Sequence, residues 1–411
     1  MSEILFISHR IPFPPDRGDK IRSHHVLRHL AAIAPVHVAT FADDEHDGIA
    51  EAELTRVATT YRVVNRTKSL ALAGVEAMLV GKPASVTAFR SKALQAYVRE
   101  TLRQREIGLI YIFSGQMGQY VPADFTGRVV VDFVDVDSAK FDAYAAAHGG
   151  IRARVEKREA ARLRAEELRV AKRASVSMFI SDEEAALFRS RLPTNERSRI
   201  PVRTLTNGID STTFDPAAVA PDPEMAALPY PRVVFTGQMD YAPNVVACLR
   251  VAHEILPAIR QTFPEASFHI VGRNPGERLK GLSGRDGIHV LGRVPDTRPY
   301  LAAADLALVP LSIARGVQNK VLEAMSMGRP TVLTPEAATG IAARTGAEFI
   351  VADGDAAIID ACVSLFSDRE RAREIGEAAR RFVVSNASWE EALAELPEIV
   401  GFNGRTARDA A

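Results

Sequence analysis

The segment with the clearest chemical potential lies late in the chain, where a lysine and a glutamate stand three residues apart. Lys320 and Glu323 follow Gly316, and the strand-like run Leu306–Val309 comes shortly before them. A helix opening at Gly316 would point unpaired N–H groups at an anion such as a phosphate. The lysine and the glutamate would share one helix face, so the carboxylate could accept two hydroxyl hydrogen bonds, as a ribose diol offers. An ordinary i,i+3 ion pair is the alternative interpretation.

A second candidate anion site follows the first predicted strand. Its loop carries Arg17, Gly18, Asp19 and Lys20 after a run of prolines. Gly18 would let the backbone approach a phosphate or sugar closely, and a helix opening near residue 19 would add its N-terminal partial charge. A polar turn that only caps the helix is the alternative. The nearby histidines are acid–base candidates or structural residues: His9, His24 and His25.

Three aspartates gather at the end of the run Val129–Val134, namely Asp132, Asp135 and Asp137. One interpretation is a role at a ligand-binding cleft, in which Asp135 would orient a substrate hydroxyl or sense its charge. Two carboxylates seldom hold a divalent ion without substrate phosphates, so no metal site is expected, although metal ligation stays an alternative. N-capping of the following helix by Asp137 or Ser138 is the structural alternative.

The elements that must position these residues alternate between short apolar runs and helical stretches. Continuous apolar runs are typical of parallel strands covered on both faces, and their alternation with helices predicts an α/β fold with two doubly wound, Rossmann-like halves. The segment 215–231 contains five prolines and cannot form one regular element; we expect the halves to join near residues 205–230, with few contacts across this segment. The predicted strands are Ile4–Ser8, Val36–Phe41, Tyr61–Val64, Leu109–Phe113, Val129–Val134 and Met178–Ile180 in the first half, and Val233–Phe235, Phe268–Val271, Ile288–Leu291, Leu306–Val309, Thr331–Leu333 and Phe349–Val351 in the second.

Composition excludes several classes of protein. The 411 residues carry 51 basic and 51 acidic side chains, so no global field steers the chain toward nucleic acid. Two cysteines cannot form a disulfide scaffold or a cysteine zinc cluster, and no apolar run approaches the roughly 20 residues of a membrane span. A cytoplasmic protein is expected.

A long helix is predicted over Ile151–Arg173 because this stretch is rich in Ala, Arg and Glu. Residues 152–173 hold nine Lys and Arg against four Glu. This excess indicates either a solvated helical face or a weak peripheral anchor for anionic lipid or glycan at the inner face of the plasma membrane.

Taken in order, the motifs resemble the GT-B glycosyltransferases of family 4 (group 1). The resemblance rests on Thr206-Asn-Gly-Ile-Asp210, Phe235-Thr-Gly237, Leu291-Gly-Arg-Val-Pro295, Gly328-Arg-Pro330 and the late Trp389. Three further stretches look like the sugar transferases associated with exopolysaccharide and PEP-CTERM (exosortase) systems: Phe13–Arg22, Asp132–Ser138 and Arg315–Lys320.

This resemblance implies two domains that face a central cleft: residues 1–204 on the acceptor side, 205–385 for the donor, and 386–411 as a helix and tail returning to the first domain. It implies a retaining transfer from a nucleotide-diphosphate sugar to a hydroxyl of a glycan or lipid-linked saccharide, without a cofactor or obligatory metal. The loop from Arg17 to Lys20 would face the acceptor and the donor phosphates. A catalytically silent scaffold or a nucleotide-sugar epimerase is the alternative. The implied donor-binding residues are Gly237, Gln238, Arg273, Arg293, Val294, Arg315, Gly316, Asn319, Lys320 and Glu323.

Several positions depart from the family pattern. Arg315 stands where the family has a glutamate, Gln238 and Asn244 stand where it has an arginine and a lysine, and Val134 falls near a usual histidine. Charge-assisted hydrogen bonds to a diphosphate must then come from other cations. The predicted catalytic residues are therefore Arg315 and Lys320, together with Asp135 on the acceptor side.

Overall fold

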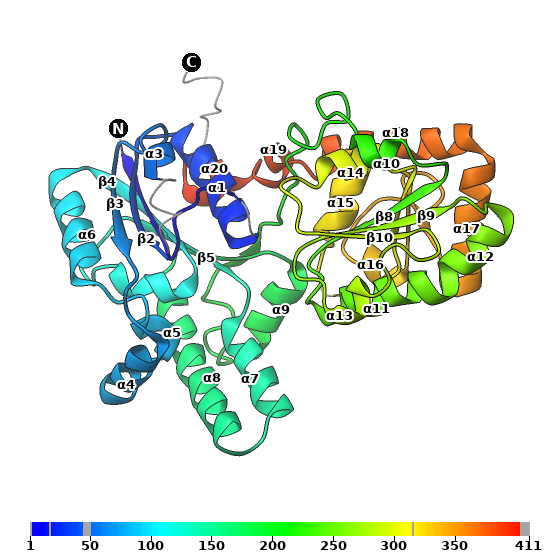
Figure 1. The fold of residues 1–411 in the computed structure, drawn as a ribbon. Helices are drawn as coiled ribbons and strands as arrows, with labels where there is room; N and C mark the ends of the chain where they lie inside the picture. The colour runs from blue at the N-terminus through cyan, green and yellow to red at the C-terminus, as the bar shows by residue number, and fades with distance from the viewer. Residues whose placement is uncertain (1, 16–17, 44–50, 315, 403–411) are drawn as a thin grey trace. The chain divides into compact units, whose positions relative to one another are not determined.

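The computed structural model describes residues 2–15, 18–43, 51–314 and 316–402. The chain divides into two compact units, one of Met1–Asn207 with Leu393–Ala411 and one of Gly208–Ala392. The sequence-based division had placed its boundaries after residues 204 and 385. Each unit is built around its own parallel β-sheet with flanking helices (Figure 1).

The first unit holds a seven-stranded sheet in the order β3-β2-β1-β4-β5-β6-β7, with every neighbouring pair parallel. All the predicted runs of this half are strands. The sequence missed β7 because this three-residue strand contains no apolar run. The strands are β1 (Glu3–Ser8), β2 (Val36–Ala42), β3 (Thr60–Asn65), β4 (Ile107–Phe113), β5 (Arg128–Val134), β6 (Val176–Phe179) and β7 (Val202–Thr204).

Helices of the first unit include the predicted long basic helix, which is α8 and spans Gly150–Ala171. It lies beside α7 as a projecting pair, next to α4 and α5 (Figure 1). The other helical segments are α1 (Gly18–Ala31), α3 (Glu51–Leu54), α4 (Leu70–Val80), α5 (Ala84–Thr87), α6 (Lys92–Gln104), the 3-10 turn η1 (Gly115–Tyr120), α7 (Asp137–Ala147), α9 (Asp182–Arg191) and α20 (Leu396–Val400).

The second unit holds a six-stranded parallel sheet in the order β10-β9-β8-β11-β12-β13, with helices above and below it in Figure 1. Its strands are β8 (Arg232–Thr236), β9 (Ser267–Val271), β10 (Ile288–Gly292), β11 (Leu306–Val309), β12 (Thr331–Leu333) and β13 (Ile350–Val351). Its helical segments are α10 (Pro223–Ala226), α11 (Ala242–Arg250), the π-turn η2 (Val251–Ile255), α12 (Leu256–Thr262), α13 (Glu277–Lys280), α14 (Arg298–Ala303), α15 (Asn319–Ser326), α16 (Pro335–Ala338), α17 (Asp355–Ser367), α18 (Arg369–Asn386) and α19 (Trp389–Ala392).

The proline-rich segment 215–231 is part of the second unit. Met225 is buried in the unit's core, and the Tyr230 hydroxyl donates to the Phe366 carbonyl at 2.9 Å. Arg380 contacts the beginning of the segment through an ion pair with Asp215 at 2.9 Å. The proline-rich chain is thus anchored on the second unit, and the expectation of few contacts between the two halves stays a prediction. The units divide earlier, between Asn207 and Gly208.

Candidate functional site

Both sheets reverse their strand order at one point, between β1 and β4 in the first unit and between β8 and β11 in the second. In open parallel α/β sheets, ligands bind outside the carboxyl ends of the strands at such a switch point. Ligand-binding residues are therefore expected after β8 and β11 in the second unit, and after β1, β4 and the neighbouring β5 in the first.

Glycines after neighbouring strands of the second sheet allow close backbone packing. A Cβ on Gly272 would lie 1.6 Å from the Gly237 carbonyl oxygen, and the Gly237 N–H donates to the Val271 carbonyl at 3.0 Å. A Cβ on Gly237 would lie 2.8 Å from Asn244 Nδ2 and 3.2 Å from Lys320 Nζ. The absence of a side chain at Gly237 thus leaves room for a lysine and an asparagine beside the switch point.

Lys320 lies in the first turn of α15 and reaches back across this point. Its Nζ donates to Asn244 Oδ1 and lies 4.5 Å from the ring centroid of Phe235. Asn244 Nδ2 in turn donates to the Gln238 carbonyl at 2.9 Å. Burial lowers the pKa of Lys320 to about 8. Asn244 of α11 therefore positions a cation supplied by α15.

Glu323 follows Lys320 on the same helix, and its carboxylate accepts no hydrogen bond or ion pair from any described residue. The ion pair with Lys320 that the spacing allowed does not form, because the lysine donates to Asn244 instead. Burial raises the pKa of Glu323 to about 7, although the positive charge of Lys320 opposes that rise. A partly buried carboxylate with free acceptor capacity suits a ligand that brings its own hydroxyl groups.

Helix α15 begins at Asn319, with Gln318 as its N-cap. The prediction that Gly316 opens the helix is wrong: Gly316 has a φ of 62° and lies in the preceding loop. A left-handed φ is incompatible with the first turn of an α-helix. Asn319 is exposed at the helix start. Arg315 lies outside the described residues, so its predicted role stays a prediction.

The remaining predicted donor residues lie along the same sheet edge. Gln238 is exposed directly after β8, while Arg273 and Arg293 are exposed after β9 and β10. Because β9 and β10 follow β8 outward in the sheet, the two arginines lie progressively farther from the switch point. Val294 packs against the apolar cluster that includes Ala324 and Met327.

In the first unit, the loop after β1 forms an ion-pair cluster. Gly18 is the first residue of α1, and Asp19 accepts from Arg10 at 2.5 Å and from His9 at 3.2 Å. Burial opposes ionisation of Asp19, but its bonds to His9 and Arg10 outweigh burial and hold its pKa well below the usual value. Lys20 is buried and its Nζ donates to the Phe13 carbonyl at 3.3 Å. Arg17 lies outside the described residues.

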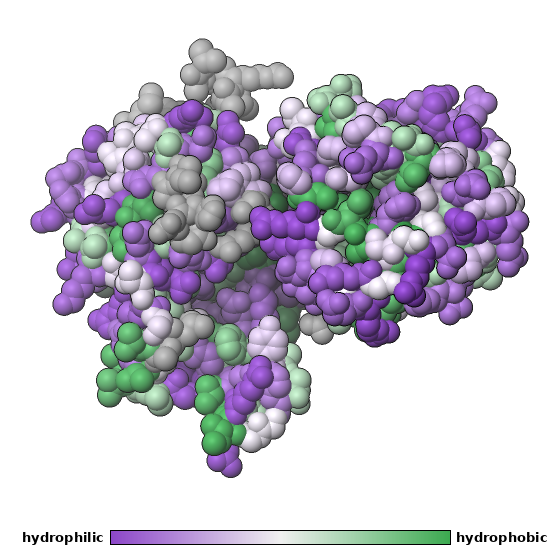
Figure 2. Space-filling model, viewed as in Figure 1, coloured by the Kyte–Doolittle hydropathy of each residue, from purple (hydrophilic) through white to green (hydrophobic). Residues whose placement is uncertain are grey.

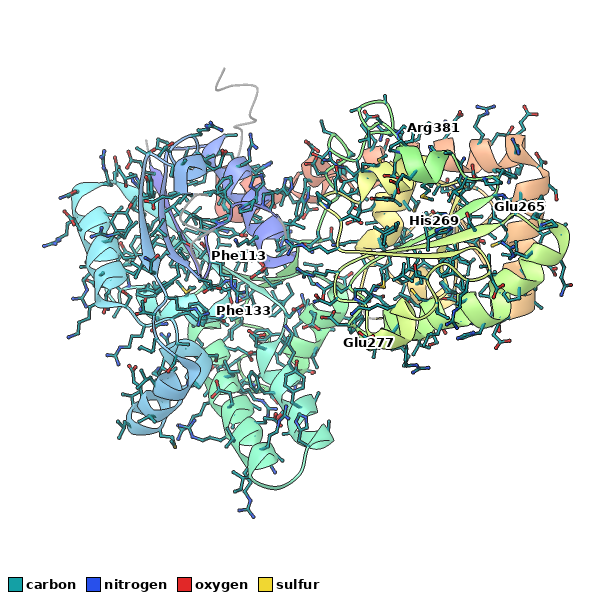
Figure 3. The ribbon with its side chains drawn as sticks, in the orientation of Figure 1. Phe113, Phe133, Glu265, His269, Glu277 and Arg381 are labelled. Carbon is teal, nitrogen blue, oxygen red and sulfur yellow. The ribbon has the colours of Figure 1, made fainter. Side chains whose placement is uncertain are left out.

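The three histidines have different surroundings. His9 is buried at the carboxyl end of β1, where its ring lies parallel to Phe113 with centroids 5.9 Å apart. Phe113 ends β4 and is labelled in Figure 3. His24 packs edge-on against Phe13, and His25 packs against His24. Among the three, His9 is the one at the end of a strand beside the switch point.

The first unit contains a buried ion pair between α1 and β5 that the sequence did not predict. Arg22 Nε donates to Asp132 Oδ2 at 2.8 Å, and both side chains are at most 1% exposed. Tyr111 donates to the same carboxylate oxygen at 3.1 Å, and Arg22 Nη1 donates to Asn207 Oδ1 at 2.9 Å. The signal in the sequence was an arginine on the inward face of α1. Asp132 is therefore fixed inside the unit and has no surface to offer a ligand.

Asp135 and Asp137 share one cation. Lys140 Nζ lies 2.8 Å from Asp135 and 3.2 Å from Asp137, and the described residues contain no group of three or more potential metal ligands. Helix α7 starts at Asp137 without a side-chain cap from it. Ser138 donates its hydroxyl to Glu167 at 2.6 Å, so N-capping by Asp137 or Ser138 is not what the structure shows.

Two non-glycine residues have left-handed backbones where β4 and β5 end. Ser114 has a φ of 76° and Val134 a φ of 70°. Such conformations cost on the order of 1–3 kcal/mol each and cluster at ligand sites. The Ser114 N–H donates to the Asp132 carbonyl at 2.8 Å, which joins the two turns. The turns after β4 and β5 therefore carry backbone strain.

Comparison with known proteins agrees with this architecture. The whole chain superposes on HepE of Anabaena, solved with UDP and glucose, with a TM-score of 0.61 and 16% identity over 98% of this chain and 100% of that one. It also superposes on WaaG, a glycosyltransferase involved in lipopolysaccharide biosynthesis, with a TM-score of 0.60 and 16% identity over 97% and 100% of the two chains. The fold is therefore GT-B.

Residues 230–368 match the family model described as "Glycosyl transferases group 1". A curated relative, the phosphatidyl-myo-inositol mannosyltransferase of Mycobacterium leprae, is 30% identical over 192 residues, which are 43% of this chain and 49% of the relative. The match thus spans about half the length of that relative. The second unit of this chain carries a group 1 glycosyltransferase domain. No helix among the described residues is long and apolar enough to cross a membrane.

Proposed function

We propose that the protein transfers a sugar from a nucleotide-diphosphate donor to a hydroxyl group of a growing surface or exopolysaccharide glycan, with retention of anomeric configuration. The observation that carries the proposal is the grouping of Lys320 and Asn244 beside Gly237, with Glu323 three residues along the same helix as Lys320, at the switch point of a group 1 glycosyltransferase domain. A lysine beside a glycine-lined backbone suits a diphosphate. A carboxylate one turn away suits ribose hydroxyls.

In this reaction the bond between the sugar C1 and the diphosphate oxygen breaks as the acceptor oxygen bonds to C1 on the same face. The acceptor's proton passes to the departing diphosphate. Lys320 stabilises the charge that develops on the leaving group, and the predicted contribution of Arg315 adds to it. Asp135, held by Lys140, orients the acceptor hydroxyl. None of these steps requires a metal ion.

The proposed family rests on the order of the motifs, and the proposed donor and acceptor rest on the names of relatives. We place the chain in family 4 and in the group associated with PEP-CTERM systems because of the stretches Phe13–Arg22, Asp132–Ser138 and Arg315–Lys320. HepE was solved with UDP-glucose, which supports a nucleotide-sugar donor here. The name of the mannosyltransferase relative supports a lipid-linked acceptor. We also propose a cytoplasmic location with peripheral contact to the membrane.

A catalytically silent homologue is the competing function, and the uncharged Gln238 and Asn244 favour it. The test is donor binding by the full chain, measured as thermal stabilisation with UDP-, GDP-, ADP- and dTDP-sugars. A donor at a hundred times its Kd stabilises a protein by about 2.7 kcal/mol. We expect one base to stabilise the protein and its sugar to be released or transferred.

The matched control is Gly237→Val, whose side chain would occupy the space beside Lys320 and Asn244. Once circular dichroism shows that the variant is folded, it should give no stabilisation with any donor. Binding of a donor without release or transfer of its sugar would support the silent homologue. No stabilisation of the unmodified chain by any of the four donors would contradict the transferase.

A further inference from the structure

Helix α4 presents its large apolar side chains to solvent and its small ones to the protein. Leu72 is 63% exposed, Met78 67% and Leu79 83%, whereas Ala73 and Ala77 are fully buried. A surface helix of a globular protein has the reverse arrangement, with its apolar stripe facing the core. A contiguous exposed apolar patch of this kind marks an interaction surface.

The single acid of α4 is neutralised. Glu76 pairs with Lys68 at 2.7 Å and with Arg90 at 3.1 Å. Val75 and Val80 extend the exposed apolar surface of the helix, and both are about half exposed. The outer side of α4 therefore offers hydrocarbon and no uncompensated negative charge.

Helix α8, next to α4, separates its charges by face. All of its acids are buried, and the exposed charged residues are cations; the buried acids are Glu156, Glu159, Glu166 and Glu167. Arg154, Lys157 and Arg162 are exposed and form no ion pair within the described part of the chain. Asp142 on α7 already pairs with Arg164 and Arg191. The outer face of α8 is thus more basic than its composition indicates.

The two helices are fixed to one another. Arg158 donates to the Ala77 carbonyl at 2.9 Å, and Glu159 accepts from the Ala84 N–H at 2.9 Å at the start of α5. Figure 2 shows the apolar surface of α4 and a second apolar area at the tip of α7 and α8 on the same projection of the first unit. Ile151 at that tip is 78% exposed and Val155 is 60% exposed.

We propose that this surface, defined as the exposed sides of α4 and α8 and called the α4–α8 face, docks on an anionic lipid bilayer. Apolar side chains next to unpaired cations on one rigid projection match the acyl boundary and the anionic headgroups of such a surface. A protein partner would need complementary acids and a defined pocket, whereas a bilayer accepts flexible Leu, Met, Lys and Arg side chains in any register. This docking rests on the peripheral membrane contact of the proposed function and gives that contact its surface and its lipid class. It needs neither donor nor catalysis, so its test can fail separately from that of the transferase.

Sedimentation of the full chain with vesicles tests the proposal directly. We expect binding to vesicles of phosphatidylcholine and phosphatidylglycerol, weaker binding at high salt, and little binding to phosphatidylcholine alone. Met78→Gln with Leu79→Gln should weaken binding at least about tenfold, since each removes an apolar side chain from the bilayer. Each of Arg154→Gln, Lys157→Gln and Arg162→Gln should weaken it roughly fivefold.

Val384→Gln is the control, because Val384 is an exposed apolar residue on a helix of the second unit; the vesicle binding of this variant should be unchanged. A fluorescence reporter gives a second readout. The chain has one tryptophan, Trp389, which is buried. Emission of Leu79→Trp should shift to the blue with anionic vesicles, and that of Val384→Trp should not.

Failure of the full chain to bind anionic vesicles, or equal loss in the Val384→Gln control, would overturn the proposal. If the chain does not bind vesicles but self-associates, and Leu79→Gln abolishes the self-association, the α4–α8 face binds a second copy. That result would also overturn the proposal. A chain that binds vesicles but no donor would leave the docking intact and contradict only the transferase.

Discussion

At the scale of single residues, Lys320 and Glu323 have pKa values shifted toward one another by burial. The pKa of Glu323 is raised to about 7 and that of Lys320 is lowered to about 8. Donor affinity should rise as the pH passes 7, because Glu323 ionises and gains acceptor capacity. It should fall above 8, because Lys320 loses its proton. We expect a maximum between these values when binding is measured by calorimetry across pH.

Glu323→Gln keeps the shape of the side chain and removes its charge. The acid limb of the pH profile should disappear, and donor binding should weaken by about 1.5–3 kcal/mol, the worth of a charged hydrogen bond. The melting temperature without donor should not fall, since Glu323 makes no bond within the described residues. An unchanged donor affinity in a folded Glu323→Gln variant would contradict the proposal that Glu323 binds the ribose hydroxyls.

Lys320→Met should lower the turnover rate about a hundredfold, the scale expected when one preorganised charge-stabilising group is removed. Donor affinity should fall less, because the lysine acts most strongly on the departing diphosphate. Steady-state kinetics that separate kcat from KM check this. Lys320→Arg is the control that keeps the charge.

A further prediction tests whether Arg315 supplies positive charge to the diphosphate in place of the uncharged Gln238 and Asn244. Arg315→Glu restores the residue usual in the family, and it should be less active than Arg315→Ala because it sets a carboxylate against the phosphates. EDTA should not abolish activity. Loss of activity in EDTA with rescue by Mn²⁺ would transfer attention to Asp135 and Asp137.

At the scale of elements, the loops after β8 and β9 depend on having no side chain at Gly272. Gly272→Ala would place a Cβ 1.6 Å from the Gly237 carbonyl oxygen, so the loops must separate. We expect loss of donor binding and a lower midpoint in urea unfolding. Gly276→Ala, where nothing lies within 4 Å of the added Cβ, should behave like the unmodified chain.

The buried pair of Arg22 and Asp132 ties α1 to β5. Breaking such a pair by removing one partner costs about 3–5 kcal/mol, because the other charge is left uncompensated. Asp132→Asn should therefore lower the stability of the first unit by this amount in urea unfolding, whereas Asp135→Asn, at a partly exposed pair, should cost far less. Equal effects of the two substitutions would contradict the assignment of Asp132 to the interior.

The sequence predicted most strands because parallel strands covered on both faces consist of continuous apolar residues. It missed β7, which has no such run. It also did not predict that the apolar side chains of α4 are exposed, because their sequence resembles that of a core helix. Lys320 and Asn244 are 76 positions apart and Arg22 and Asp132 are 110 apart. Their pairing depends on sheet order and packing, which single-sequence patterns do not contain.

At the scale of the whole molecule, the late helix α20 packs on the first unit, which also contains the start of the chain. Leu396, Ile399 and Val400 of α20 are buried, and Arg128 donates to the Ile399 carbonyl at 2.7 Å and 3.0 Å. The second unit, Gly208–Ala392, is inserted between the two parts of the first.

This insertion dictates an order of events during synthesis on the ribosome. The second unit is complete when Ala392 emerges, while the first unit still lacks α20, whose Ile399 carbonyl accepts from Arg128. The nascent protein thus passes through a stage in which the second unit can already fold while the first still exposes the apolar surface that α20 later buries. A chain stalled at Ala392 should bind donor yet be cut by protease within residues 2–207, and release of the last residues should end that sensitivity.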